Sequence, residues 1–151
     1  MSIQDYEEAR LMIEKSDEAD FEGEKDLKLI EAAENALALK FPPSYRRFLS
    51  ELGCGDIGGE EFYGIIDDNF VASSVPNGIW LTLDERKCNN LSHDFILIYG
   101  DGSDGYCAID TSSKSEDGEN QVVRLSIDNS KSEFVASSFG TFLKEIVSLV
   151  V

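Results

Sequence analysis

Basic residues are scarce in this sequence. Only 13 Lys and Arg stand against 30 Asp and Glu in 151 residues, which gives a formal net charge of −17 at pH 7 and a pI near 4.2. Such a charge repels nucleic acid and anionic membranes, and it attracts basic partners over a Debye length of roughly 8 Å. We therefore expect no nucleic-acid or membrane partner, although acidity also serves solubility alone.

Cysteine, histidine and long apolar runs are also scarce. Cys54, Cys88 and Cys107 lie far apart without a CxxC pair, so neither a disulfide framework nor a zinc site is indicated. The N-terminus is acidic where a signal peptide needs bases, and no apolar run approaches the ~18 residues of a membrane span. These features predict a cytoplasmic protein that needs no cofactor.

No residue pattern indicates catalysis. The only histidine, His93, has no GxSxG elbow or other nucleophile motif to serve. Adjacent acids are too common here to single out a catalytic pair, which leaves a small hydrolase as a remote alternative. The stretch Asp101–Gly105 lacks the residue order of a calcium loop, and its glycines suit a tight turn. We expect neither an enzyme nor a bound metal.

The segment Phe41–Gly55 contains the clearest signals for helix ends. Two prolines stop one helix, Ser44 or the turn at Pro43 starts a short one, and Gly53 ends it. The apolar residues of this short helix recur at helical spacing, so one of its faces is buried.

Periodicity predicts the remaining elements. We expect helices near residues 3–13, at Glu24–Lys40 with Glu31 and Glu34 outward, and after Ser137 or Ser138. The segment Trp80–Lys87 suits a strand or a short helix capped by Thr82, and we favour the helix. We expect strands at Phe62–Ile66, Asn69–Val75, Phe95–Tyr99, Tyr106–Ile109 and Gln121–Ile127. The acidic stretch Glu14–Asp26 is interpreted as a solvated connector or as an acidic binding lip, and Thr111–Asn120 as a surface loop.

These elements predict one α+β domain over residues 1–151. Its central sheet is mainly antiparallel or mixed, and helices from the N-terminal third and the C-terminus pack on it.

Three blocks in this order resemble the SUKH superfamily. They are Leu37 with Phe41-Pro42, Tyr45, Phe48-Leu49 and Gly53 to Gly55; Ile96 to Asp110 with its Gly-Asp-Gly turn; and Ser138, Phe139, Phe142 and Leu143. Phe41 stands where members usually carry Leu, and Cys54-Gly55 where Asn-Gly or Gly-Gly is common. The superfamily includes yeast cell-wall-assembly regulators and many bacterial immunity proteins, and it has no catalytic signature.

The resemblance and the charge together suggest binding. We expect an immunity protein that neutralises a cognate, basic toxin domain, typically a nuclease, as a monomer or weak dimer; the alternative is a regulatory scaffold. The predicted contact residues form one acidic rim at the strand ends with two aromatic anchors. They are Glu60, Glu61, Tyr63, Asp67, Asp68, Trp80, Asp101 and Asp104. For Tyr63 and Trp80, a place in the core is the alternative.

Overall fold

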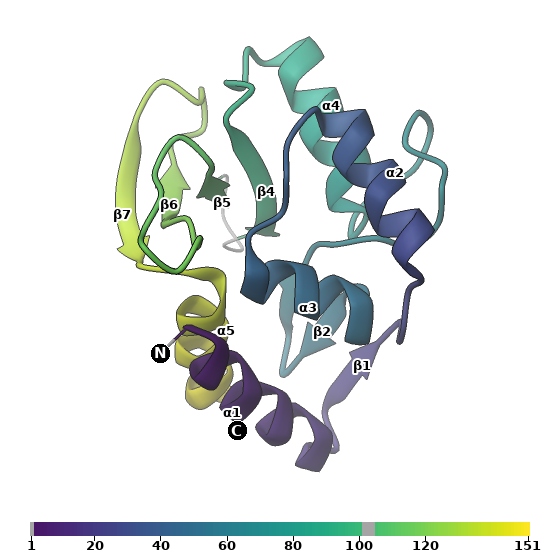
Figure 1. Cartoon of the computed structure of the whole chain (residues 1–151), viewed down its shortest axis with the longest axis vertical. Coiled ribbons are helices and arrows are strands. Elements are labelled where there is room, and N and C mark those ends of the chain that lie inside the picture. The colour runs from purple at the N-terminus through teal and green to yellow at the C-terminus, as the bar shows by residue number, and fades with distance from the viewer. Residues whose placement is uncertain (1, 101–104) are drawn as a thin grey trace.

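Over residues 2–100 and 105–151, which this computed structural model describes, the chain forms five helices and seven strands (Figure 1). The helices are α1 (Ser2–Lys15), α2 (Leu27–Leu37), α3 (Pro43–Glu51), α4 (Gly78–Cys88) and α5 (Phe139–Val150). The strands are β1 (Ala19–Phe21), β2 (Gly55–Ile57), β3 (Glu60–Phe62), β4 (Phe95–Gly100), β5 (Tyr106–Asp110), β6 (Val122–Leu125) and β7 (Ser132–Ala136).

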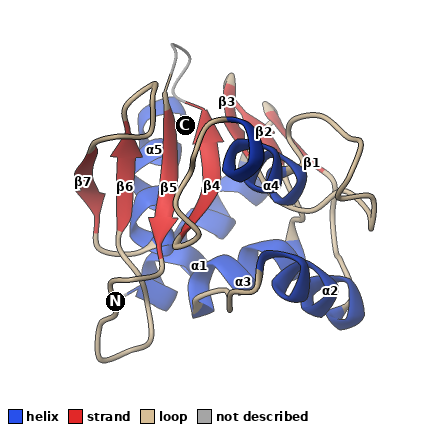
Figure 2. Cartoon of the chain, turned by 90° about the horizontal axis from the view of Figure 1, so that it is seen from above, coloured by secondary structure: helices blue, strands red, loops and turns tan. Residues whose placement is uncertain are grey.

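The strands form one antiparallel sheet in which spatial order follows chain order, β1 to β7. Figure 2 shows α5 behind this sheet and α4 in front of it. The predicted α+β class, with helices packed on an antiparallel sheet, is confirmed. The expected hairpin of Phe95–Tyr99 and Tyr106–Ile109 is also confirmed as β4 and β5.

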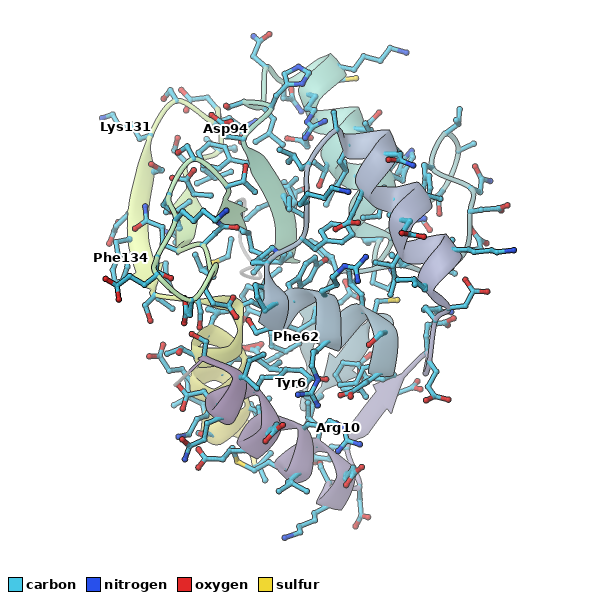
Figure 3. All side chains as sticks on the ribbon, viewed as in Figure 1. Tyr6, Arg10, Phe62, Asp94, Lys131 and Phe134 are labelled. Carbon is cyan, nitrogen blue, oxygen red and sulfur yellow. The ribbon has the colours of Figure 1, made fainter. Side chains whose placement is uncertain are left out.

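An aromatic cluster fills the space between the sheet and helices α3 and α5. The ring of Phe48 lies 6.3 Å from that of Phe62 on β3 and 5.0 Å from that of Phe139 on α5, measured between centroids. Tyr45 stacks on Phe48, and all four rings are fully buried (Figure 3 labels Phe62). We call this side of the sheet the inner face.

A second, smaller cluster lies under α4 on the outer face. It contains Tyr63, Leu97, Ala108 and Val123, with Trp80 of α4 packed against them. The two clusters cover opposite faces because successive residues of a strand point to opposite sides.

The helix signals around Phe41–Gly55 act as predicted. Proline stands at the first turn of α3, and Gly53 follows the helix with φ of 75°, a left-handed conformation that glycine adopts without strain. A Cβ there would also lie 2.9 Å from the carbonyl oxygen of Gly23. Ser138 caps α5 by accepting a hydrogen bond from the Thr141 N–H.

Helix α4 confirms the helix expected at Trp80–Lys87, but its cap is different. Asn77 accepts hydrogen bonds from the N–H groups of Ile79 and Trp80, so Thr82 lies inside the helix. The Thr82 hydroxyl instead donates to the Gly78 carbonyl and accepts from the Leu97 N–H, which joins α4 to β4.

Several strand assignments were wrong or missing. Asn69–Val75 is irregular rather than a strand, because side chains of Asn69 and Asn77 satisfy its backbone groups. The presumed connector Glu14–Asp26 contains β1, which pairs with β2. Neither β2 nor β7 was predicted, and the strand expected at Phe62–Ile66 begins earlier and ends at Phe62.

Two acids expected at the surface are buried. Glu34 is 3% exposed: its carboxylate accepts from the Phe41 N–H and contacts the Arg46 guanidinium. Glu119, in the presumed surface loop, is 2% exposed and accepts from both the N–H and the hydroxyl of Ser44 at 2.9 Å. The Ser44 oxygen in turn accepts from the Gly140 N–H, so Glu119 joins three segments.

Burial of Glu119 predicts a pH-dependent stability. Desolvation, with a smaller effect of the Asp117 charge, raises the pKa of the Glu119 carboxyl despite its hydrogen bonds to Ser44. A raised pKa means that the folded state binds the proton more tightly, so this group favours folding below its unfolded pKa and loses that effect as pH rises through the folded value.

Glu119→Gln removes the titration and keeps an oxygen acceptor. We expect the melting temperature of the variant, minus that of the wild type, to be highest near pH 7.5 and to fall as pH is lowered toward 4.5. Thermal unfolding followed by circular dichroism at several pH values measures this difference. A difference that stays constant with pH would contradict the assignment.

Candidate partner-binding surface

Three neighbouring strands each place one carboxylate in the same cross-strand row. Asp20 of β1 lies directly opposite Asp56 of β2, and Asp56 lies directly opposite Glu61 of β3. Side chains at directly opposite positions in an antiparallel pair have Cβ atoms roughly 4.5–5.5 Å apart. We call these three residues the acidic row.

The acidic row lies on the outer face because its neighbours are fixed inward. Phe62, next to Glu61, is fully buried in the aromatic cluster, and Ile57, next to Asp56, is also fully buried. Strand alternation then turns Asp56 and Glu61 away from the core. Asp20 follows on the edge strand and is exposed.

No positive charge compensates the acidic row. Within the described ranges, none of its three carboxylates makes an ion pair or a side-chain hydrogen bond. The same part of the chain holds no group of three or more His, Cys, Asp or Glu placed to hold a metal ion. Like charges at directly opposite strand positions destabilise a sheet, so this arrangement costs stability in the isolated chain.

Just beyond the ends of β1 and β2, acids also surround a buried thiol. The pKa of Cys54 is raised to about 12, mainly by burial; the charges of Glu22 and Glu61 contribute to this rise, and the charge of Lys25 opposes it. Lys25 is engaged: it pairs with Glu22 at 3.2 Å and donates to the Ile66 carbonyl at 2.9 Å. Because Lys25 is already paired, it leaves the acidic row unneutralised. Such a surface suits a cationic partner.

The residues of the predicted acidic rim do not all lie on one surface. Glu61 belongs to the acidic row, but Glu60 points to the inner face, where it accepts a hydrogen bond of 2.8 Å from the Tyr99 hydroxyl. Asp67 and Asp68 lie farther along the chain, on the wall of a separate hollow of about 560 Å³ beside the first turn of α2. Asp101 and Asp104 lie outside the described residues.

The two predicted aromatic anchors belong to the smaller core. Tyr63 is 6% exposed, and its ring packs against Tyr106 with centroids 6.2 Å apart. Trp80 is half-buried against the same cluster. Tyr63 therefore does not form part of the accessible surface, which is the alternative that the sequence had left open.

Asp20 and Asp56 were missed by sequence reasoning. Asp20 lies in the stretch Glu14–Asp26, for which an acidic binding lip was one interpretation, and β1 makes that stretch part of the sheet. Gly55 permits this approach, because a Cβ there would collide with the Asp20 carbonyl oxygen. Gly55 beside Asp56 was the available signal, but it does not reveal which strand comes near.

Residues 27–143 match a family described as SUKH_6, SMI1-KNR4 cell-wall. The matched span covers most of the chain, from α2 into α5. The chain belongs to the SUKH superfamily. No curated protein matches it.

The SUKH match and the acidic row overlap only in part. Asp56 and Glu61 fall inside the matched span, whereas Asp20 precedes it. The edge strand β1 therefore lies on the N-terminal side of the matched residues.

Among the described residues, no helix has the length and apolar character that a membrane span requires.

Neutralising the middle of the acidic row should stabilise the isolated protein. Asp56→Asn removes repulsion toward both neighbours, and we expect the free energy of unfolding to rise by about 0.5 kcal/mol at low salt. Because exposed charges are screened, the gain should shrink in 0.5 M salt. Urea denaturation at both salt concentrations measures it.

Glu31→Gln serves as the matched control, since Glu31 is exposed on α2 and not on the strands that carry the acidic row. It lowers the net negative charge equally but leaves the row intact. Equal stabilisation by the two substitutions would show that only total charge matters.

Proposed function

We propose that this protein is an immunity protein, which neutralises a cognate, basic toxin domain by stoichiometric binding. The observation that carries the proposal is the acidic row: three carboxylates opposed across adjacent strands, with no ion pair to any of them among the described residues. A cost of this kind in the free protein is offset when a partner supplies the missing positive charge. Membership of a superfamily that includes many immunity proteins supports the same proposal.

The mechanism is occlusion rather than catalysis. A toxin that cleaves nucleic acid needs a cationic cleft for its anionic substrate, and an acidic surface competes for that cleft. Long-range attraction between the two would raise the association rate toward ~10⁸ M⁻¹s⁻¹ at low salt. The protein acts in the cytoplasm, as a monomer or weak dimer, and makes or breaks no covalent bond.

The alternative is a regulatory scaffold like the eukaryotic members of the superfamily. A scaffold does not protect against a toxin and has no toxin gene beside its own. Coexpression with the product of the neighbouring toxin-like reading frame decides between the two: an immunity protein restores growth. Absence of such a neighbour, together with absence of protection, would refute the proposal.

Charge removal from the acidic row should slow association. We expect the combined variant Asp20→Asn, Asp56→Asn, Glu61→Gln to bind the neighbouring gene product with an association rate about tenfold lower at low salt, and with a weaker salt dependence. Stopped-flow mixing over a series of salt concentrations gives both quantities.

The control removes the same charge elsewhere, by Glu31→Gln, Glu116→Gln and Glu145→Gln, all exposed positions. A long-range effect of net charge would slow both variants equally. A local surface slows only the first, and that contrast is the expected result.

A further inference from the structure

The segment Ile66–Pro76, which connects β3 to α4, forms neither helix nor strand. Binding residues lie disproportionately on loops that a rigid scaffold holds in place. We call Ile66–Pro76 the Asn69 loop. Its shape is fixed by side chains rather than by secondary structure.

Asn69 organises the middle of the Asn69 loop. Its side-chain oxygen accepts from the N–H groups of Val71 and Ala72, at 3.2 and 3.1 Å, and its side-chain nitrogen donates to the Ala72 carbonyl at 2.8 Å. The Asn69 N–H donates to Asp67 at 2.9 Å. These bonds hold residues 67–72 in one tight turn.

The two ends of the Asn69 loop are fastened to buried structure. Asn77 is fully buried, and its side-chain nitrogen donates to the Asn69 carbonyl and to the Ser73 hydroxyl while its oxygen caps α4. At the other end, Lys25 donates to the Ile66 carbonyl. The loop is therefore held in its shape before any partner arrives, which lowers the entropy cost of binding.

The fastened turn presents an apolar side chain to solvent. Val71 is 89% exposed, the largest exposed fraction among the large apolar side chains of the described chain, and Val75 is 43% exposed. A single exposed valine is ordinary on a protein surface. Here, however, the hydrogen bonds of Asn69 hold the Val71 backbone, and the carboxylates of Asp67 and Asp68 are exposed in the same turn.

We propose that the Asn69 loop is the apolar contact of the partner interface, with Val71 as the side chain that enters the partner. This inference rests on the proposed function and names a second element of its surface. The partner that fits is a protein with a small apolar pocket bordered by Lys or Arg, which would pair with Asp67 and Asp68. Val71 would then be the apolar anchor of the interface, a role that Tyr63 does not fill because it is buried.

A second copy of this chain is a poorer occupant. Each copy carries a net charge of −17, and two loops brought together would oppose Asp67 and Asp68 with like charges. A cationic partner removes this repulsion. Beside the loop, the wall of the 560 Å³ hollow carries Glu24 and Asp26 against Lys25 and Lys28, so Asp67 and Asp68 leave it with an excess of negative charge.

The test measures binding of the neighbouring toxin-like gene product by surface plasmon resonance to three variants. Val71→Ser removes the apolar contact, and we expect the dissociation rate to rise about tenfold at every salt concentration, as for the loss of one buried valine. Asn69→Ala keeps Val71 but loosens the turn, and we expect an affinity loss of a few-fold. Leu149→Ser, at an 81% exposed position on α5, is the control and should bind as wild type.

Each outcome decides a different question. If the wild type binds and Val71→Ser dissociates at the wild-type rate, the Asn69 loop is not part of the interface and the proposed function stands. If Leu149→Ser weakens binding as much as Val71→Ser, the effect is not specific to the loop and the inference fails. If the wild type does not bind the gene product, the proposed function fails, and this inference fails with it. Unchanged melting temperatures establish that the variants are folded.

Discussion

Burial of Phe62 against Phe48 and Phe139 determines which way each residue of β3 faces. Once this ring is inside, strand alternation turns Glu61 and Tyr63 to the outer face and Glu60 to the inner one. A one-residue slip would place Glu61 in an aromatic core, at a cost far above that of any surface repulsion. The register that follows across β2 and β1 then aligns Asp56 and Asp20 with Glu61. The acidic row is thus a consequence of core packing as well as of sequence.

The helices could be predicted from the sequence because their signals are local. Paired prolines, Gly53 and the cap at Ser138 act within a few residues of the helix ends they specify. The short strands β1 and β2 could not be predicted, since three residues are too few for an alternation of apolar and polar positions to be recognised. The pairing of β1 with β2 also joins residues more than thirty positions apart, which local patterns do not reveal.

Buried polar groups account for the other differences. Glu34 has the helical position of a surface residue, yet it is buried because the Phe41 N–H and Arg46 satisfy its carboxylate. Asn69–Val75 has the composition of a strand, but Asn69 and Asn77 offer its backbone a different set of hydrogen bonds. Of the predicted contact residues, Glu61 lies in the acidic row on the outer face. Tyr63 is buried, because aromatic composition does not distinguish an anchor from a core residue.

The two parts of the proposed interface act at different ranges. Charges in the acidic row act over roughly a Debye length and are weakened by salt, so they govern how often a cationic partner arrives. Val71 acts only in contact, so it governs how long the partner stays. A surface of carboxylates alone would attract every basic protein in the cell with little discrimination. A rigid loop that requires a matching pocket supplies the discrimination, because a basic protein without that pocket loses the apolar contact and must accommodate the loop.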